Sequence, residues 1–180
     1  MNDTCLRAEC AQCAALCCVV LSFDASERFA LDKPAGRPCP HLCTSGGCTI
    51  HPAREALGFG GCIDYSCFGA GQRVTQELFD GQSWQDDPSL LMPMMDAFRS
   101  MRLVHELLLL LEQAGRLPLS APDRRTCRML VSMLTPKGGW TRDALGDFEH
   151  GPEPERIRYF LRSLARYFGL HGARQTMEFG

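Results

Sequence analysis

The sequence predicts a mainly α-helical protein, in which an irregular cysteine-rich N-terminal part packs on a small C-terminal helical bundle. Ten of the eleven cysteines lie before residue 68, in a stretch whose prolines and glycines stop both helices and strands. In the second half, apolar side chains recur at three- and four-residue steps, which is the helical period. We therefore expect two domains, residues 1–80 and 81–180.

The first element is the stretch CAQCAALCCVV at residues 10–20. If it forms a helix that turns by about 100° per residue, Cys10, Cys13 and Cys17 share one stripe and Cys18 lies beside it. Such thiols can pack as small hydrophobic residues or pair as disulfides. Alanine and valine, which this stretch also uses, would pack equally well. Four thiols close together therefore favour one wall of a metal site.

The segment that follows supplies more thiols in place of an apolar core. Its turns, as in DKPAGRPCPHLCTSGGC and GFGGC, prevent the burial of a large apolar surface, so we expect bound metal to stabilise it. The further thiols are Cys39, Cys43, Cys48, Cys62 and Cys67. Zinc takes four thiolate or imidazole ligands, and an iron–sulfur cluster usually takes four thiolates. The set could serve two zinc ions, one cluster with spare thiols, or two clusters, and the adjacent pair CC favours a polynuclear or two-site arrangement.

Three helices are expected in the second half. The first runs from Ser89 to Ala114. The second is capped by Ser120 and ends before Pro136. The third spans residues 154–168, with one apolar face. That face is formed by Ile157, Leu161, Leu164 and Phe168. The segments TPKGGW and HGPEPE are interpreted as loops.

The cysteine segments also follow an order: CAQCAALCC, then CPHL, then CTIHPAR, then GC. This order resembles the bacterial cysteine-cluster family described as zinc- or iron-chelating domains, which includes relatives of flagellin N-methylase. FALDKPAGRPC and CFGAGQRV further resemble a branch in which the cluster often precedes pentapeptide repeats, which are absent here. The resemblance covers about residues 5–80 and implies metal chelation without naming a reaction. The ligands that it implies are Cys10, Cys13, Cys17, Cys18, Cys39, Cys48 and Cys62, and the residues themselves add Cys67 as an eighth candidate.

Other thiols and imidazoles receive different predictions. His51 lies three residues after Cys48 and could replace a thiolate, although a hydrogen-bonding role is favoured. Cys5 and Cys43 are expected to be spare thiols or donors to cluster sulfur. Cys127 lies within a helical pattern and is expected to be a buried packing thiol.

The charge and the lack of long apolar runs narrow the classes of function. A formal charge of −2 gives no electrostatic argument for nucleic acid or membrane binding. The first residues lack the basic start of an export signal, and LLLLL at 107–111 is far short of the roughly 20 apolar residues of a membrane span. We therefore expect a cytoplasmic protein in a reducing compartment, where clustered cysteines more often bind metal than cross-link.

The sequence thus predicts a metal-binding protein with a cysteine-ligated iron–sulfur cluster or zinc site. A cluster would support electron transfer or a redox-assisted modification of a protein partner. Zinc would instead stabilise a protein-interaction module, and surplus thiols could buffer copper or zinc. No Ser-His-Asp or Cys-His catalytic arrangement is recognisable, so neither a reaction nor a substrate is assigned.

Overall fold

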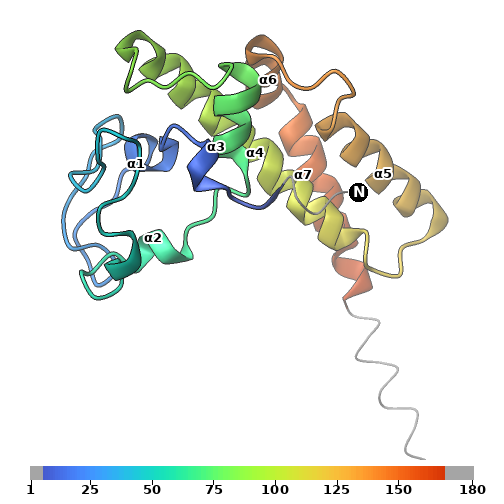
Figure 1. Cartoon of the computed structure of the whole chain (residues 1–180). Helices are drawn as coiled ribbons and strands as arrows, with labels where there is room; N and C mark the ends of the chain where they lie inside the picture. The colour runs from blue at the N-terminus through green and yellow to red at the C-terminus, as the bar shows by residue number, and fades with distance from the viewer. Residues whose placement is uncertain (1–5, 169–180) are drawn as a thin grey trace, which may run out of the picture. The chain divides into compact units, whose positions relative to one another are not determined.

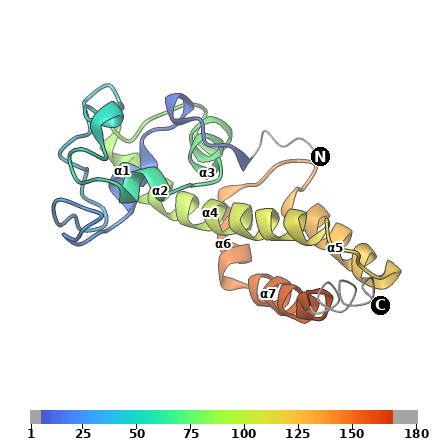
Figure 2. The ribbon, with the colours of Figure 1, turned by 90° about the horizontal axis from the view of Figure 1, so that it is seen from below.

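The computed structural model describes residues 6–168, and these are mainly helical, as the sequence predicts (Figure 1). Extended segments in this range pair only through isolated bridges, such as the one between Phe23 and Lys33, and build no sheet. The chain forms two compact units that divide between Arg102 and Leu103. The division falls within the long helix α4, Leu91–Ala114, which Figure 2 shows as one continuous helix.

The opening cysteine stretch of the N-terminal unit is not one helix. A 3₁₀ turn covers Cys10–Gln12, and helix α1 covers only Leu16–Val20. Between them the backbone is extended at Cys13 (φ −117°, ψ 137°) and left-handed at Ala15 (φ 53°). The prediction that the first three cysteines of the stretch share one helical stripe is therefore wrong.

The helix is interrupted because side chains from elsewhere in the unit bind the backbone at Ala14. The Ala14 N–H donates to Thr75 Oγ1 at 3.0 Å, and the Ala14 carbonyl accepts from Trp84 Nε1 at 2.7 Å. Both groups are therefore used in tertiary hydrogen bonds instead of the bonds to residues four positions away that a helix requires.

The loops that follow α1 carry very little apolar core. Figure 1 shows residues 21–60, coloured blue to cyan, as a series of irregular turns beside α1 and α2 (Gly61–Asp64). Residues 20–58, all of which the structure describes, contain no buried apolar side chain. The rings of Phe23 and Phe29 stack with centroids 4.1 Å apart, but the buried side chain in this segment is that of Lys33.

The apolar core of the N-terminal unit is formed instead by α1, by α3 and by the first half of α4. Helix α3 covers Ala70–Arg73 and continues as a π-helical segment through Val74–Leu78. Each fully buried leucine or phenylalanine contributes roughly 1.5–3 kcal/mol to folding. The core side chains of this unit with the least exposure are Leu16, Val19, Ala70, Val74, Met94, Phe98 and Met101.

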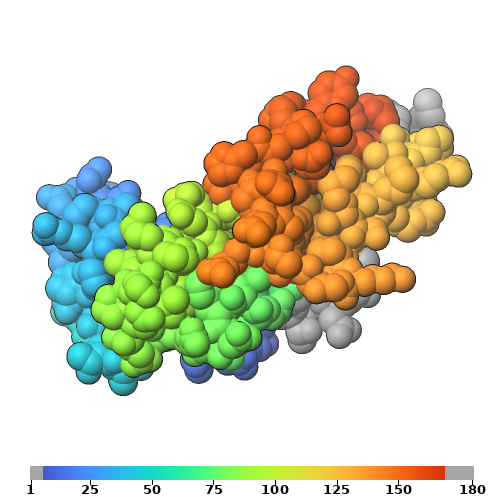
Figure 3. Space-filling view, turned by 90° about the horizontal axis from the view of Figure 1, so that it is seen from above, coloured from blue at the N-terminus to red at the C-terminus, as the bar shows by residue number. Residues whose placement is uncertain are grey.

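The C-terminal unit contains the remainder of α4 and three further helices. Helix α5 spans Ala121–Leu134, α6 spans Arg142–His150, and α7 spans Glu153–Ser163. Residues of α6 and α7 (orange to red) form a continuous surface of this unit on the face drawn in Figure 3. The predicted cap of α5 is confirmed, because the Ser120 side chain accepts from the Asp123 N–H.

Two details of this unit differ from the sequence prediction. Helix α6, which was not predicted, begins after Thr141, whose hydroxyl accepts from the Ala144 N–H at 3.2 Å. After α7 the chain tightens into a 3₁₀ turn, Leu164–Tyr167. Three residues per turn replace 3.6 there, so Tyr167 is buried and Phe168 is 67% exposed. The prediction that Phe168 belongs to the apolar face is wrong.

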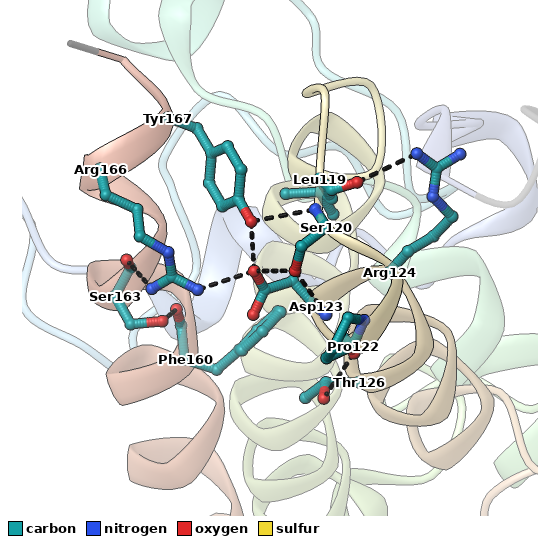
Figure 4. A network of polar contacts seen from close by, with 10 residues as sticks. All are labelled: Leu119, Ser120, Pro122, Asp123, Arg124, Thr126, Phe160, Ser163, Arg166 and Tyr167. Carbon is teal, nitrogen blue, oxygen red and sulfur yellow. Dashed lines mark hydrogen bonds and ion pairs between the residues drawn. The ribbon is translucent and has the colours of Figure 1, made fainter. Parts of the chain in front are cut away.

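A polar network joins the start of α5 to the turn after α7 (Figure 4). Asp123 Oδ2 accepts from the Tyr167 hydroxyl, from Ser120 Oγ at 2.7 Å and from Arg166 Nη2 at 2.7 Å. The bond from Tyr167, followed by those from Ser120 and Arg166, lowers the pKa of the Asp123 carboxyl to about 2. The network therefore depends on an ionised Asp123.

The prediction for Cys127 is confirmed. Cys127 is buried, and its thiol donates to the Leu111 carbonyl at 3.3 Å, as expected for a packing thiol. None of the helices within residues 6–168 combines the length and the apolar character needed to cross a membrane.

Candidate metal centre

The backbone of the first cysteine segment is held by glutamine side chains that follow Ala70 in the helix. Gln72 makes two bonds: its Oε1 accepts from the Glu9 N–H at 2.8 Å, and its Nε2 donates to the Arg7 carbonyl at 2.8 Å. Gln76 Nε2 donates to the Gln12 carbonyl at 2.9 Å. These bonds fix the path of a segment that forms little secondary structure of its own.

Four of the predicted ligands line one small cavity in the N-terminal unit. Its volume is about 20 Å³, which is room for about one water-sized body. The other lining residues include Glu9, Gln72 and Phe98. We call the four cysteines the first thiol group: Cys10, Cys13, Cys17 and Cys67.

Cys13 of this group packs against Gly71, where any larger residue would displace the thiol. A Cβ atom added to Gly71 would lie 2.5 Å from Cys13 Sγ, well inside van der Waals contact. Burial raises the pKa of the Cys13 thiol to about 11, although hydrogen bonds from the backbone of Leu16 and Ala15 act in the opposite direction. Hydrogen bonds of this kind orient and stabilise metal-bound thiolates.

Two non-glycine residues beside this group have left-handed backbone conformations. Ala15 (φ 53°) lies between Cys13 and Cys17, and Phe68 (φ 52°) directly follows Cys67. This conformation costs roughly 1–2 kcal/mol per residue, and strained residues of this type cluster at functional sites. The strain is therefore located where the chain turns to present the thiols.

The remaining predicted ligands form a second thiol group: Cys18, Cys39, Cys48 and Cys62. The Cys39 N–H donates to the Cys18 carbonyl at 2.9 Å, which brings these two segments together. Burial raises the pKa of Cys62, and the charges of Cys18, Cys39 and Cys48 raise it further. Burial also raises the pKa of Cys39, with added effects from Cys18 and Cys48. Cys39 and Cys62 therefore both lie near Cys18 and Cys48.

Arg54 connects the segments that carry the last two members of this group. Its Nη1 donates to the Cys62 carbonyl at 3.2 Å, and its Nε donates to the His51 carbonyl at 2.9 Å. His51 itself is exposed and begins a 3₁₀ turn three residues after Cys48. Arg54 thus fixes Cys62 beside the loop of Cys48, and its positive charge lies close to the thiols.

The two thiol groups meet at the adjacent residues Cys17 and Cys18, whose sulfur atoms lie 4.0 Å apart. Their contact raises the pKa of Cys17, and burial adds to this. The same contact lowers the pKa of Cys18, with help from the positive charges of Lys33 and Arg54. Cys18 is therefore the thiol of this pair that loses its proton first.

Lys33 is the residue of this site that the sequence analysis missed. Its side chain is 3% exposed, and Nζ donates to the carbonyls of Val19 (3.3 Å), Pro34 (3.3 Å) and Arg37 (3.0 Å). An ammonium group has three N–H donors, so all of them are used. Its charge acts on the thiols of Cys39, Cys18, Cys17 and Cys62. The available signal was composition, because Lys33 is one of two lysines in a chain that otherwise uses arginine.

Two further cysteines lie apart from both groups or outside the described range. Cys43 Sγ lies 2.9 Å from Ser45 Oγ and accepts from the Gly47 N–H at 3.2 Å, within an exposed loop. These bonds lower its pKa. Cys5 lies outside the described residues. Across residues 6–168, no three Cys, His, Asp or Glu side chains are placed as ligands around a common point. The thiols therefore lie in two groups, but their sulfur atoms do not have the positions of metal ligands.

A comparison with known proteins finds a curated relative of this chain. The chain is 40% identical over 133 residues to the uncharacterized protein YybG of Bacillus subtilis (strain 168). The match covers 72% of this chain and 48% of YybG, so the chain spans about half the length of this relative. No family model and no solved structure matches. The chain is therefore a homologue of YybG over most of its own length.

Proposed function

We propose that this chain binds metal through the thiols of its N-terminal unit, as a cysteine-ligated iron–sulfur cluster or as zinc. The proposal agrees with the resemblance to the cysteine-cluster family of zinc- or iron-chelating domains. The observation that carries it is the cavity of about 20 Å³ that is lined by four cysteines. Thiolates are soft ligands that favour iron–sulfur clusters, zinc or copper(I).

The thiols of the N-terminal unit differ from a cysteine that serves packing alone. Cys127 provides the comparison within the same chain: it is 4% exposed, and its thiol donates to a backbone carbonyl. Cys13, Cys17 and Cys67 are only partly buried and line a shared cavity. Cys17 and Cys18 are too far apart, at 4.0 Å between sulfurs, for the disulfide bond length of about 2 Å.

The loop segment gives a physical reason for a metal to be present. Residues 20–58 bury no apolar side chain, so hydrophobic burial does little to offset the entropy cost of ordering them. Binding of a structural zinc ion contributes about 10–16 kcal/mol in small zinc domains, which would offset part of this cost. This observation favours a second candidate function, a zinc-stabilised module that binds a protein partner.

The chain's own residues would hold the thiols and balance their charge in either case. Lys33 and Arg54 place two positive charges beside the second thiol group, where thiolate ligands gather negative charge. A bound cluster would supply one-electron transfer to a partner, whereas bound zinc would supply rigidity. A reducing compartment such as the cytoplasm would keep the thiols available.

The test is the metal and acid-labile sulfide content, with a visible spectrum, of protein purified without oxygen. Iron and sulfide in equal amounts with a brown spectrum would assign a cluster, and zinc without sulfide would assign the structural module. Cys13→Ser should lower the metal content, whereas Cys127→Ser, the matched control, should leave it unchanged. Absence of metal would refute the proposal, and equal metal in Cys13→Ser and the wild type would overturn the assignment of Cys13 to the site.

A further inference from the structure

We propose that the N-terminal unit holds two separate metal centres, which divide between Cys17 and Cys18. The first thiol group would hold one centre and the second thiol group the other. This inference rests on the proposed function, and it adds the number of centres and the division of the ligands between them.

The first thiol group has its own cavity and its own scaffold. The cavity of about 20 Å³ is lined by all four of its cysteines and by none of the second group. Gly71 leaves space for Cys13, and Gln72 fixes the backbone on both sides of Ala8. Cys67 reaches the cavity from the residues that precede the same helix, because the Ala70 N–H bonds to its carbonyl at 3.0 Å.

The second thiol group is assembled by different contacts. The bond from the Cys39 N–H to the Cys18 carbonyl joins two of its segments. Cys48 forms a bridge with Leu42, whose N–H donates to the Cys39 carbonyl at 2.9 Å. Arg54 then connects the Cys62 carbonyl to the turn that follows Cys48. None of these described contacts involves a cysteine of the first group.

The hydrogen bonds of the buried Lys33 join segments of the second group. Lys33 Nζ is bonded to the Val19 carbonyl, directly after Cys18, and to the Arg37 carbonyl, two residues before Cys39. These bonds hold the two segments together, and the charge of Lys33 acts on Cys18, Cys39 and Cys62 and also on Cys17 of the first group. The two centres would be close neighbours, because Cys17 Sγ and Cys18 Sγ lie 4.0 Å apart, but they would differ in their surroundings.

Zinc binding to the full chain tests this division. The apoprotein is reconstituted with Zn²⁺ without oxygen, freed of loosely bound metal and analysed for zinc per chain. The wild type should hold two equivalents. Removing two thiols from the first group (Cys13→Ser with Cys67→Ser) should leave one, and removing two from the second group (Cys39→Ser with Cys48→Ser) should also leave one. Cys43→Ser, the control, should retain two.

The possible outcomes distinguish this inference from the proposed function. Loss of all zinc from either double variant, or one equivalent in the wild type, would indicate a single centre, refuting the division while metal binding stands. No zinc in the wild type would refute both. If the second-group variant fails to fold by circular dichroism, Cys62→Ser alone tests that group, because it should hold one equivalent. Two equivalents in that variant would assign Cys62 elsewhere and overturn the ligand set.

Discussion

Replacing Gly71 by alanine should displace a proposed metal ligand with little change in the fold. The added methyl group would lie 2.5 Å from Cys13 Sγ and 3.7 Å from Phe98 Cε2. Nonbonded atoms of this size prefer separations of about 3.5–4 Å. The thiol must therefore retreat by about 1 Å or more, whereas the phenylalanine ring is already in ordinary contact and need not move.

The energies and distances at Gly71 predict that the substitution lowers the metal content more than it lowers the free energy of unfolding. Alanine in place of a helical glycine gains about 0.5–1 kcal/mol, while a crowded core position costs about 1–3 kcal/mol. The net loss of folding free energy is then between about 0 and 2.5 kcal/mol. A zinc–sulfur bond is about 2.3 Å long and tolerates deviations of only about 0.2 Å, so a thiol that retreats by about 1 Å no longer acts as a ligand.

The assay compares metal per chain and urea unfolding for Gly71→Ala, Gly146→Ala and the wild type. Gly146 is the matched control, because it also lies in a helix, α6, and a Cβ atom there meets nothing within 4 Å. Gly71→Ala should lose the metal of the first thiol group, whereas Gly146→Ala should keep all metal and be equally or slightly more stable. Full metal content in Gly71→Ala would show that Cys13 is not a ligand in this position.

Two further predictions concern charged residues. Lys33→Met leaves the carbonyls of Val19, Pro34 and Arg37 without their donor, so the free energy of unfolding measured in urea should fall by about 1–3 kcal/mol. Metal analysis should show that only the metal of the second thiol group is lost. Unchanged stability together with unchanged metal content would exclude the proposed role of Lys33. Asp123→Asn should lower the melting temperature above pH 4, and the difference from the wild type should shrink as the pH falls toward 2. The reason is that the pKa of Asp123 is lowered from 3.8 to about 2, so the stabilisation by the carboxylate is lost as it is protonated. A difference in melting temperature that stays constant between pH 5 and pH 2 would contradict the stabilising role of the ionised Asp123.

The sequence was most informative about the C-terminal helices. Helical spacing and the cap residue Ser120 located α4 and α5 close to their observed bounds, because local patterns determine where such helices begin and end. Helix α6 is short and only two of its side chains, Leu145 and Phe148, are buried. Its apolar pattern is therefore too brief to recognise, and the cap at Thr141 was its clearest local signal.

The opening cysteine stretch shows why local patterns were insufficient in the first half. Residues 10–20 have a composition compatible with a helix, but the Ala14 backbone bonds to Thr75 and Trp84, more than sixty residues away along the chain. Contacts at that separation are not encoded in the spacing of neighbouring residues. Helical geometry therefore placed Cys10, Cys13 and Cys17 on one stripe, whereas tertiary contacts place them, with Cys67, around a cavity.

The candidate ligands could be named from the sequence, but their division could not. Residue type identifies a thiol that is able to bind metal, and the ordered spacing indicates that several act together. Which thiols act together depends on long-range bonds, such as the one from the Cys39 N–H to the Cys18 carbonyl, and on the buried charge of Lys33. Because these contacts hold segments with no apolar core between residues 20 and 58, the same residues that would define the second centre also determine whether those loops fold. If the second centre binds metal as proposed, metal binding and folding of the loops between residues 20 and 58 would be one process, whereas the rest of the N-terminal unit and the C-terminal unit each have buried apolar side chains.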